Sequence, residues 1–175
     1  MYTMSQINQM SKETFIQTIG AVFEKSPWIS ERAWYYTPFQ SAGHMQEMLI
    51  EEMYEASRED QLDLLRSHPD LGTRLAMTDS SQSEQQGAGL NMLTEEEYRQ
   101  LTRMNQRYTE TFGFPFIMAV KGKSKKEIIE QMAIRVEREE KTEFNAALDE
   151  VANIAAFRLA DLTDVPEYST NEREG

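Results

Sequence analysis

The sequence predicts an all-α fold, a single-domain bundle of about seven to eight helices. Apolar residues recur at helical spacing along most of the chain, and serine or threonine precedes several of these segments at a capping position. Only one short run has the composition of a strand. At 175 residues the chain can bury one core, which we place in residues 1–163, and the polar residues 164–175 are predicted to form a tail or linker.

The first half of the chain is predicted to contain three longer helices. The first begins after Ser11 and ends before Pro27, and the next two run from Ser41 to Ala56 and from Ser57 to the residue before Pro69. A residue that precedes proline is disfavoured in the helical region, so the third helix ends there. The aromatic segment 26–36 is predicted to be a short turn or helix packed on the core.

The second half is predicted to contain two helices that open with a capping box, 94–111 and 124–141, and a last helix from Thr142 to about Leu162. In each capping box a serine or threonine is followed three residues later by glutamate. Gly113 is expected to end the first of these helices. The run 114–120 has no partner strand and is predicted to be a buried extended connector.

Composition narrows the classes of function. Asp and Glu outnumber Lys and Arg by 30 to 18, so the chain repels phosphate backbones and anionic lipid, and we expect neither nucleic acid nor membrane as a partner. The absence of cysteine excludes disulfides and thiolate catalysis. No secretory signal or long apolar run is visible, which favours a cytoplasmic protein.

Residues 67–90 are predicted to be a loop between helices, and they carry the first candidate catalytic residue, His68. An unperturbed pKa near 6.5 suits general acid or base catalysis, and Pro69 restricts the backbone beside the ring. The alternative is that His68 is structural. His44, the only other histidine, lies within a predicted helix and is interpreted as structural or exposed.

Ser81, Glu84 and Gln85 form a second group of candidates in the same stretch. Ser-x-x-Glu is also the pattern of a capping box, so the alternative is the start of a short helix. Glu84 and Gln85 are neighbours, and side chains about 100° apart on a helix can line one edge of a pocket.

Arg158 lies on or beside the apolar stripe of the last predicted helix. A guanidinium in that position needs a carboxylate, either from a ligand or from the protein itself. An internal salt bridge and a residue at the rim of the core therefore remain alternatives to a substrate anchor.

Metal binding has weak support, because His68, Asp70 and Glu84 lack a second histidine at ligand spacing. From the residues alone, the chain is a helical protein that could form a pocket with histidine, glutamate and arginine.

Five motifs, in order, resemble the 2-oxo-4-hydroxy-4-carboxy-5-ureidoimidazoline (OHCU) decarboxylase family of urate degradation. They are Phe-Glu-x-Ser-Pro-Trp at 23–28, His-Pro-Asp-Leu-Gly at 68–72, Ser-x-x-Glu-Gln-x-x-Ala-Gly-Leu at 81–90, Tyr-x-x-x-Phe-Gly-Phe-Pro-Phe-Ile at 108–117, and Ile-Ala-x-x-Arg-Leu at 154–159. The resemblance covers roughly residues 10–162.

The resemblance implies an all-helical decarboxylase without cofactor or metal, commonly a homodimer, that converts OHCU to (S)-allantoin. It implies His68 and Glu84 as catalytic residues. It implies substrate binding by Pro69, Ser81, Gln85, Arg158 and the backbone of Phe114 and Phe116. Some family members are fused to a uricase domain, so the polar tail is compatible with a fusion to, or association with, a uricase.

Two other functions stay open from the sequence. One is a helical interaction module without catalytic activity, which would use the acidic surface to bind a partner. The other is a metal-dependent lyase or hydrolase that uses His68, Asp70 and Glu84.

Overall fold

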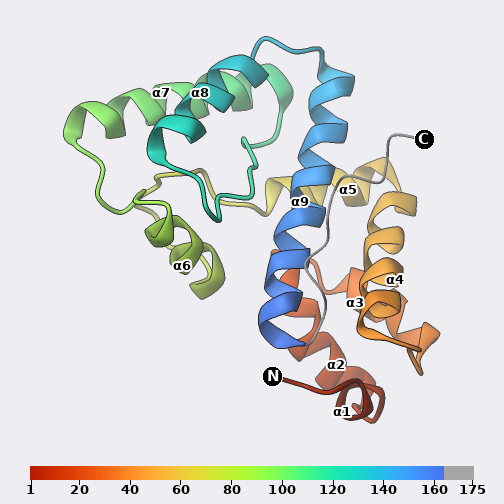
Figure 1. Cartoon of the computed structure of the whole chain (residues 1–175). Coiled ribbons are helices and arrows are strands. Elements are labelled where there is room, and N and C mark those ends of the chain that lie inside the picture. The colour runs from red at the N-terminus through yellow and green to blue at the C-terminus, as the bar shows by residue number, and fades with distance from the viewer. Residues whose placement is uncertain (164–175) are drawn as a thin grey trace. The chain divides into compact units, whose positions relative to one another are not determined.

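The computed structural model describes residues 1–163, and this part of the chain is all-helical, as predicted (Figure 1). Its only β-type pairing is an isolated bridge between Tyr2 and Thr163. No helix within the described range is long and apolar enough to span a membrane. The predicted tail, 164–175, lies outside the described residues.

The α-helices and two 3-10 helices (η) are α1 Met4–Asn8, α2 Lys12–Thr18, η1 Gly20–Val22, α3 Trp28–Ala33, η2 Trp34–Tyr36, α4 Ala42–Glu55, α5 Arg58–Arg66, α6 Asp79–Gly87, α7 Glu95–Phe112, α8 Lys125–Arg135 and α9 Glu140–Leu162.

The described chain forms two compact units. The first comprises residues 1–61 together with residues 152–163, and the second comprises residues 62–151. Their boundaries fall within α5 and α9. The prediction of one domain over residues 1–163 stays a prediction.

In the first unit, α2 begins at its predicted cap but ends earlier than expected. The Ser11 side chain accepts a hydrogen bond from the backbone N–H of Thr14, and the helix ends at Thr18 instead of continuing toward Pro27. Gly20 follows this end, and glycine is a weak helix former. A Cβ at this position would lie 2.3 Å from Ser30 Oγ of α3, so a larger residue would require the Ser30 side chain to move. The chain continues as η1.

The aromatic segment that follows is helical, as predicted, but only part of it is buried. Ile29 and Ala33 of α3 belong to the core, whereas Tyr35 and Tyr36 of η2 are exposed. The capped helices α4 and α5 agree with the prediction. Ser41 accepts from the backbone of His44, and Ser57 accepts from the backbone of Asp60.

In the second unit, α7 and α8 lie side by side, and both begin with the predicted capping boxes (Figure 1). Gly113 ends α7 with a left-handed φ of 81°. The segment 114–120 is neither helix nor strand and is largely buried, so the predicted connector is confirmed.

The predicted end of the helix at Lys141 was wrong, because α8 ends at Arg135 and α9 begins at Glu140. The Arg135 side chain points into the unit, where it bonds to a backbone carbonyl and to Glu143 of α9. A continuous helix would not bring these groups together, because eight residues of straight helix span about 12 Å. Tertiary contacts therefore override local helical periodicity.

Candidate active site

Residues 67–90 were predicted to be a loop. They instead include a helix, α6, Asp79–Gly87. Thr78 is its N-cap, and the Thr78 hydroxyl accepts a hydrogen bond from the Ser81 backbone at 3.3 Å. Ser81 is therefore not the cap that the Ser-x-x-Glu pattern suggested. It lies within the first turn of the helix, and Ser81 and Gln85, one turn apart, are both buried.

His68 follows the end of α5 and is half-buried. Its Nδ1 lies 2.9 Å from the carbonyl oxygen of Leu64. A carbonyl only accepts hydrogen bonds, so we assign the proton to Nδ1. Nε2 is then the nitrogen that gains and loses a proton when the ring titrates. The last turn of α5 thus sets both the orientation and the tautomer of the ring.

Two helices fix the segment that follows His68. The backbone N–H of Gly72 donates to Gln85 Oε1 of α6 at 2.9 Å, and Asn105 Nδ2 of α7 donates to the Leu71 carbonyl at 2.9 Å. Gly72 has a φ of +73°, which favours glycine. These contacts place the His-Pro-Asp-Leu-Gly segment beside the helix that carries Ser81, Glu84 and Gln85.

Sequence reasoning missed Asn105, although a signal was present. The buried positions of α7 are Leu101, Asn105, Tyr108 and Phe112, so an amide occurs at helical spacing among apolar residues. The Nδ2 of Asn105 donates to the Leu71 carbonyl. The buried Oδ1 of Asn105 has no hydrogen-bond partner within residues 1–163. An amide on an apolar face indicates a specific partner, in this case a loop 34 residues away in the chain.

The two acidic candidates of this region differ in environment. Glu84 of α6 is half-buried beside Gln85, whereas Asp70 is more exposed to solvent. Partial desolvation nevertheless raises the pKa of the Asp70 carboxyl above its ordinary value. Among the residues that the structure describes, no three His, Cys, Asp or Glu side chains are grouped closely enough to bind a metal ion. His68, Asp70 and Glu84 therefore do not form a three-ligand site.

Phe114 and Phe116 contribute rings to an aromatic cluster that also contains Tyr108, Phe112 and Phe144. Both rings are almost completely buried. Their backbone groups make no hydrogen bond to another peptide group in the described chain. The side chains of Phe114 and Phe116 thus lie in the core, while their peptide groups lie outside any helix or sheet of the described chain.

A pocket of about 570 Å³ lies between α6 and the segment before it. Gln85 is the one predicted site residue that lines it. The pocket is lined by Thr73, Arg74, Leu75, Ala76, Met77, Gln82, Gln85, Gln86, Leu90 and Asn91.

Arg158 belongs to the first unit and is buried in α9. Its Nη2 lies 3.2 Å from Glu24 Oε1, and its Nη1 donates to the Val22 carbonyl at 3.3 Å. Glu24 is itself only 2% exposed. The internal salt bridge that the sequence left open is therefore present, and it joins two of the motifs on which the family resemblance rests.

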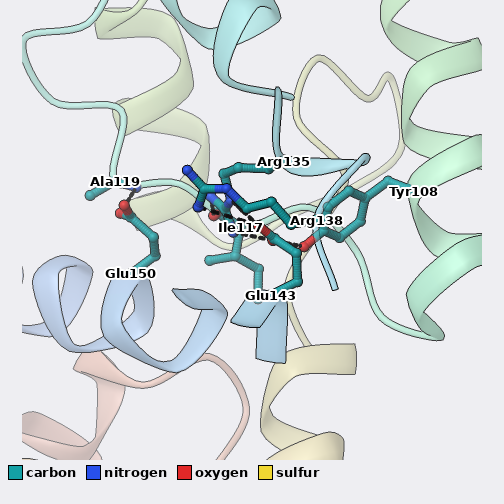
Figure 2. Close-up of polar contacts among 7 residues, drawn as sticks. All are labelled: Tyr108, Ile117, Ala119, Arg135, Arg138, Glu143 and Glu150. Atoms are coloured by element: carbon teal, nitrogen blue, oxygen red, sulfur yellow. Dashed lines mark hydrogen bonds and ion pairs between the residues drawn. The ribbon is translucent and has the colours of Figure 1, made fainter. Parts of the chain in front are cut away.

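A second buried ion pair, in the second unit, was not predicted. Arg135 Nη2 of α8 lies 3.0 Å from Glu143 Oε2 of α9, and the Tyr108 hydroxyl donates to the same carboxylate (Figure 2). Burial, with this hydrogen bond as a second cause, raises the pKa of Tyr108 far above its usual range. The raised pKa favours the protonated phenol, which is the form that donates to Glu143.

The fold is an all-helical one in which a histidine segment and a Ser/Glu/Gln helix lie together, and comparison with known proteins identifies the class. The family model described as OHCU decarboxylase matches residues 8–160. The chain therefore belongs to the OHCU decarboxylase family, which is a family of carboxy-lyases.

Individual relatives agree. The chain is 44% identical over 171 residues to the 2-oxo-4-hydroxy-4-carboxy-5-ureidoimidazoline decarboxylase of Halalkalicoccus jeotgali, covering 98% of this chain and 97% of that one. It is 46% identical over 162 residues to the uric acid degradation bifunctional protein PucL of Bacillus subtilis. That match covers 93% of this chain but only 33% of PucL, so the chain spans about a third of that bifunctional relative.

Solved structures support the fold. A crystal structure of (S)-allantoin synthase matches with a TM-score of 0.76 at 23% identity, covering 93% of this chain and 55% of that one. A crystal structure of OHCU decarboxylase in the presence of (S)-allantoin matches with a TM-score of 0.70 at 20% identity, covering 87% of this chain and 98% of that one.

Proposed function

We propose that this chain decarboxylates OHCU to (S)-allantoin in urate degradation, without a cofactor. The observation that carries the proposal is the match to a relative of the same length, 44% identical over 97% of a protein named as this decarboxylase. The five ordered motifs of the sequence add support, because they include the histidine, the glutamate and the arginine to which we assign proton transfer and substrate binding.

The substrate's own structure supplies the electron sink. One ring carbon of OHCU carries the hydroxyl and the carboxylate, and the neighbouring carbon forms a C=N bond. When the bond to CO2 breaks, its electron pair forms a C=C bond, and the C=N pair moves to the ring nitrogen, which takes a proton. The hydroxyl then loses its proton to become the carbonyl, and the neighbouring carbon is protonated on one face. The balance is OHCU carboxylate plus one proton to allantoin plus CO2.

These steps require proton transfer at the hydroxyl, the ring nitrogen and carbon, and we assign it to His68 and Glu84. The Nδ1 contact with Leu64 leaves Nε2 as the titrating nitrogen of His68, which supports an acid–base role. Glu84 lies beside Gln85, which bonds directly to the segment that follows His68. Glu84 is therefore the carboxylate we assign as the partner of the histidine.

The remaining predicted residues are proposed to bind substrate. Ser81, Gln85 and Pro69 orient it in the second unit, and the free peptide groups of Phe114 and Phe116 bind its ring and ureido edges. Arg158 keeps its proposed role as the anchor for the substrate's carboxylate on the family resemblance, since a guanidinium fork suits a carboxylate.

The test follows decay of freshly made OHCU and the chirality of the product, because unassisted decay gives racemic allantoin. His68→Ala and Glu84→Gln should each lower the rate by about 10²- to 10⁴-fold. Matched controls are His44→Ala, the only other histidine, and Glu96→Gln, an exposed glutamate of α7. Wild-type rates in either active-site variant would overturn that assignment.

The same assay separates the two rival functions. A wild-type chain that neither accelerates OHCU decay nor yields an excess of (S)-allantoin would favour an interaction module. Activity that is lost with a chelator and restored by a divalent cation would favour a metal-dependent lyase.

We also propose that the chain is a cytoplasmic homodimer, compatible with association with a uricase, on the family resemblance. The relatives named as bifunctional in uric acid degradation support the last point. Light scattering of the purified chain, alone and mixed with a uricase, tests the dimer and the association. A monomer that does not bind the uricase would overturn both of these.

A further inference from the structure

The segment 114–120 lacks helical and sheet hydrogen bonds, so side chains determine its path. Two of them bond to its backbone, as Figure 2 shows. Arg135 Nη1 of α8 donates to the Ile117 carbonyl at 2.7 Å, and the Ala119 N–H donates to Glu150 Oε2 of α9 at 2.8 Å. The backbone next to Phe116 is thus fixed from two helices.

Arg135 is itself confined to one orientation. Its Nε donates to both carboxylate oxygens of Glu143 at 3.1 Å, and its guanidinium lies 4.5 Å from the centre of the Phe116 ring. Tyr108 donates a further hydrogen bond to Glu143, and Arg138 lies 3.6 Å from the same carboxylate at the edge of the cluster. The Glu143 carboxylate of α9 therefore contacts three side chains, one from α7, one from α8 and Arg138 from the loop between α8 and α9. Of these three, Arg135 bonds to the Ile117 carbonyl of the connector.

Stability alone is a weak reason for this arrangement. Moving a guanidinium and a carboxylate out of water is costly, and apolar residues of similar volume often stabilise a core equally well. What an apolar replacement cannot provide is a donor to the Ile117 carbonyl in a defined direction. An arginine fork can bond to Glu143 and Ile117 at once, which a lysine ammonium on a flexible stem does less well.

We infer that Arg135, with Glu143, Tyr108 and Glu150, positions the connector for substrate recognition. The two backbone contacts fix residues 117 and 119, and the Arg135 guanidinium lies against the Phe116 ring. Together they orient the peptide groups of Phe114 and Phe116 toward the substrate's polar edges. These four are positioning residues and do not touch the reacting atoms. The inference rests on the proposed function, because it requires that those peptide groups bind OHCU.

The test compares Arg135→Lys and Glu150→Ala with matched changes in the exposed pair Arg107–Glu137. A connector displaced by about 1 Å lowers kcat/KM by about 100-fold. Because substrate recognition is weakened, most of this should come from a raised KM. Arg107→Lys and Glu137→Ala should leave KM and kcat unchanged. Thermal unfolding of each variant is measured alongside.

An active, folded Glu150→Ala protein with wild-type KM would overturn the positioning role. Should Arg135→Lys fail to fold, the combined variant Arg135→Met, Glu143→Leu, Tyr108→Phe replaces the whole cluster with apolar groups. A raised KM in that folded variant supports the inference, and an unchanged KM overturns it. A wild-type chain that does not process OHCU would instead overturn the proposed function, so the two failures are distinguishable.

Discussion

Gln85 Oε1 accepts a hydrogen bond from the backbone N–H of Gly72 at 2.9 Å, and both residues are buried. This bond connects α6 with the segment that begins at His68. It gives Gln85 a role in the geometry of the site beyond the substrate contact that the sequence suggested. A side chain that orients the histidine segment affects catalysis even where it does not touch substrate.

Gln85→Met should lower both stability and activity. The substitution leaves a buried N–H without its acceptor, which costs about 1–3 kcal/mol, and it frees the histidine segment to move. We expect kcat/KM for OHCU to fall by about 10- to 100-fold. Gln85→Glu keeps an acceptor oxygen and should lose less. The control is Gln100→Met, at an exposed position of α7. Equal kinetics in Gln85→Met and Gln100→Met would contradict the role.

Gly72→Ala should destabilise the protein more than Gly122→Ala. Both glycines have a positive φ, +73° and +75°, so both substitutions introduce backbone strain of about 1–2 kcal/mol. An added Cβ at Gly72 would also lie 2.4 Å from Leu101 Cδ2, whereas nothing lies within 4 Å of one at Gly122. Overpacking should add about 1–3 kcal/mol at Gly72 alone. Urea unfolding measures the difference, and equal losses would argue that Leu101 moves aside without cost.

Local signals predicted the beginnings of helices well. Ser11, Thr94 and Ser124 all cap the helices they were expected to cap, because an N-cap bond joins residues only three apart. Ser41, predicted only as the start of a helix, caps α4. Thr78 is the instructive exception. Ser81 completed a more obvious motif with Glu84, but the residue three positions earlier is the actual cap. Two candidate caps compete locally, and packing of the helix decides between them.

Interactions between distant residues were not predictable. Arg135 and Glu143 are separated by a break between helices, and the Ile117 carbonyl that Arg135 binds lies 18 residues upstream of it. Nothing in the periodicity around Arg135 distinguishes it from the solvent-facing Arg138. The candidate site residues were predicted because family motifs identify positions, whereas the groups that orient those positions follow from the fold.

Arg158→Met alone should be strongly destabilising, which refines how its role is tested. Glu24 stays buried when its arginine partner is removed, and breaking such a pair costs about 3–5 kcal/mol. Adding Glu24→Gln removes the remaining charge and should recover part of the loss in urea unfolding. Arg32→Met, which breaks the exposed pair with Asp60, should cost under about 1 kcal/mol.

The double variant Glu24→Gln, Arg158→Met then tests substrate binding in a folded protein. If Arg158 anchors the carboxylate of OHCU, the KM of the double variant for OHCU should rise by about 10-fold or more. This is the size expected for the loss of a charge-assisted hydrogen bond. A wild-type KM would make Arg158 purely structural.

Acid should weaken α7 and α8 through their capping glutamates. The Thr94 backbone N–H donates to Glu97 and the Ser124 backbone N–H donates to Glu127, and these bonds lower the pKa of both carboxyls below their usual 4.5. A carboxyl whose pKa is lower in the folded state stabilises the protein above its unfolded pKa. That contribution is lost as the pH falls through the folded-state pKa.

The thermal midpoint between about pH 6 and 3 should therefore fall more steeply for wild type than for the double variant Glu97→Gln, Glu127→Gln. The amide oxygens of the two glutamines accept the same hydrogen bonds without carrying a charge. Glu96→Gln, in the same first turn of α7 but outside the capping box, should follow the wild-type slope, and a parallel slope in the double variant would contradict the mechanism.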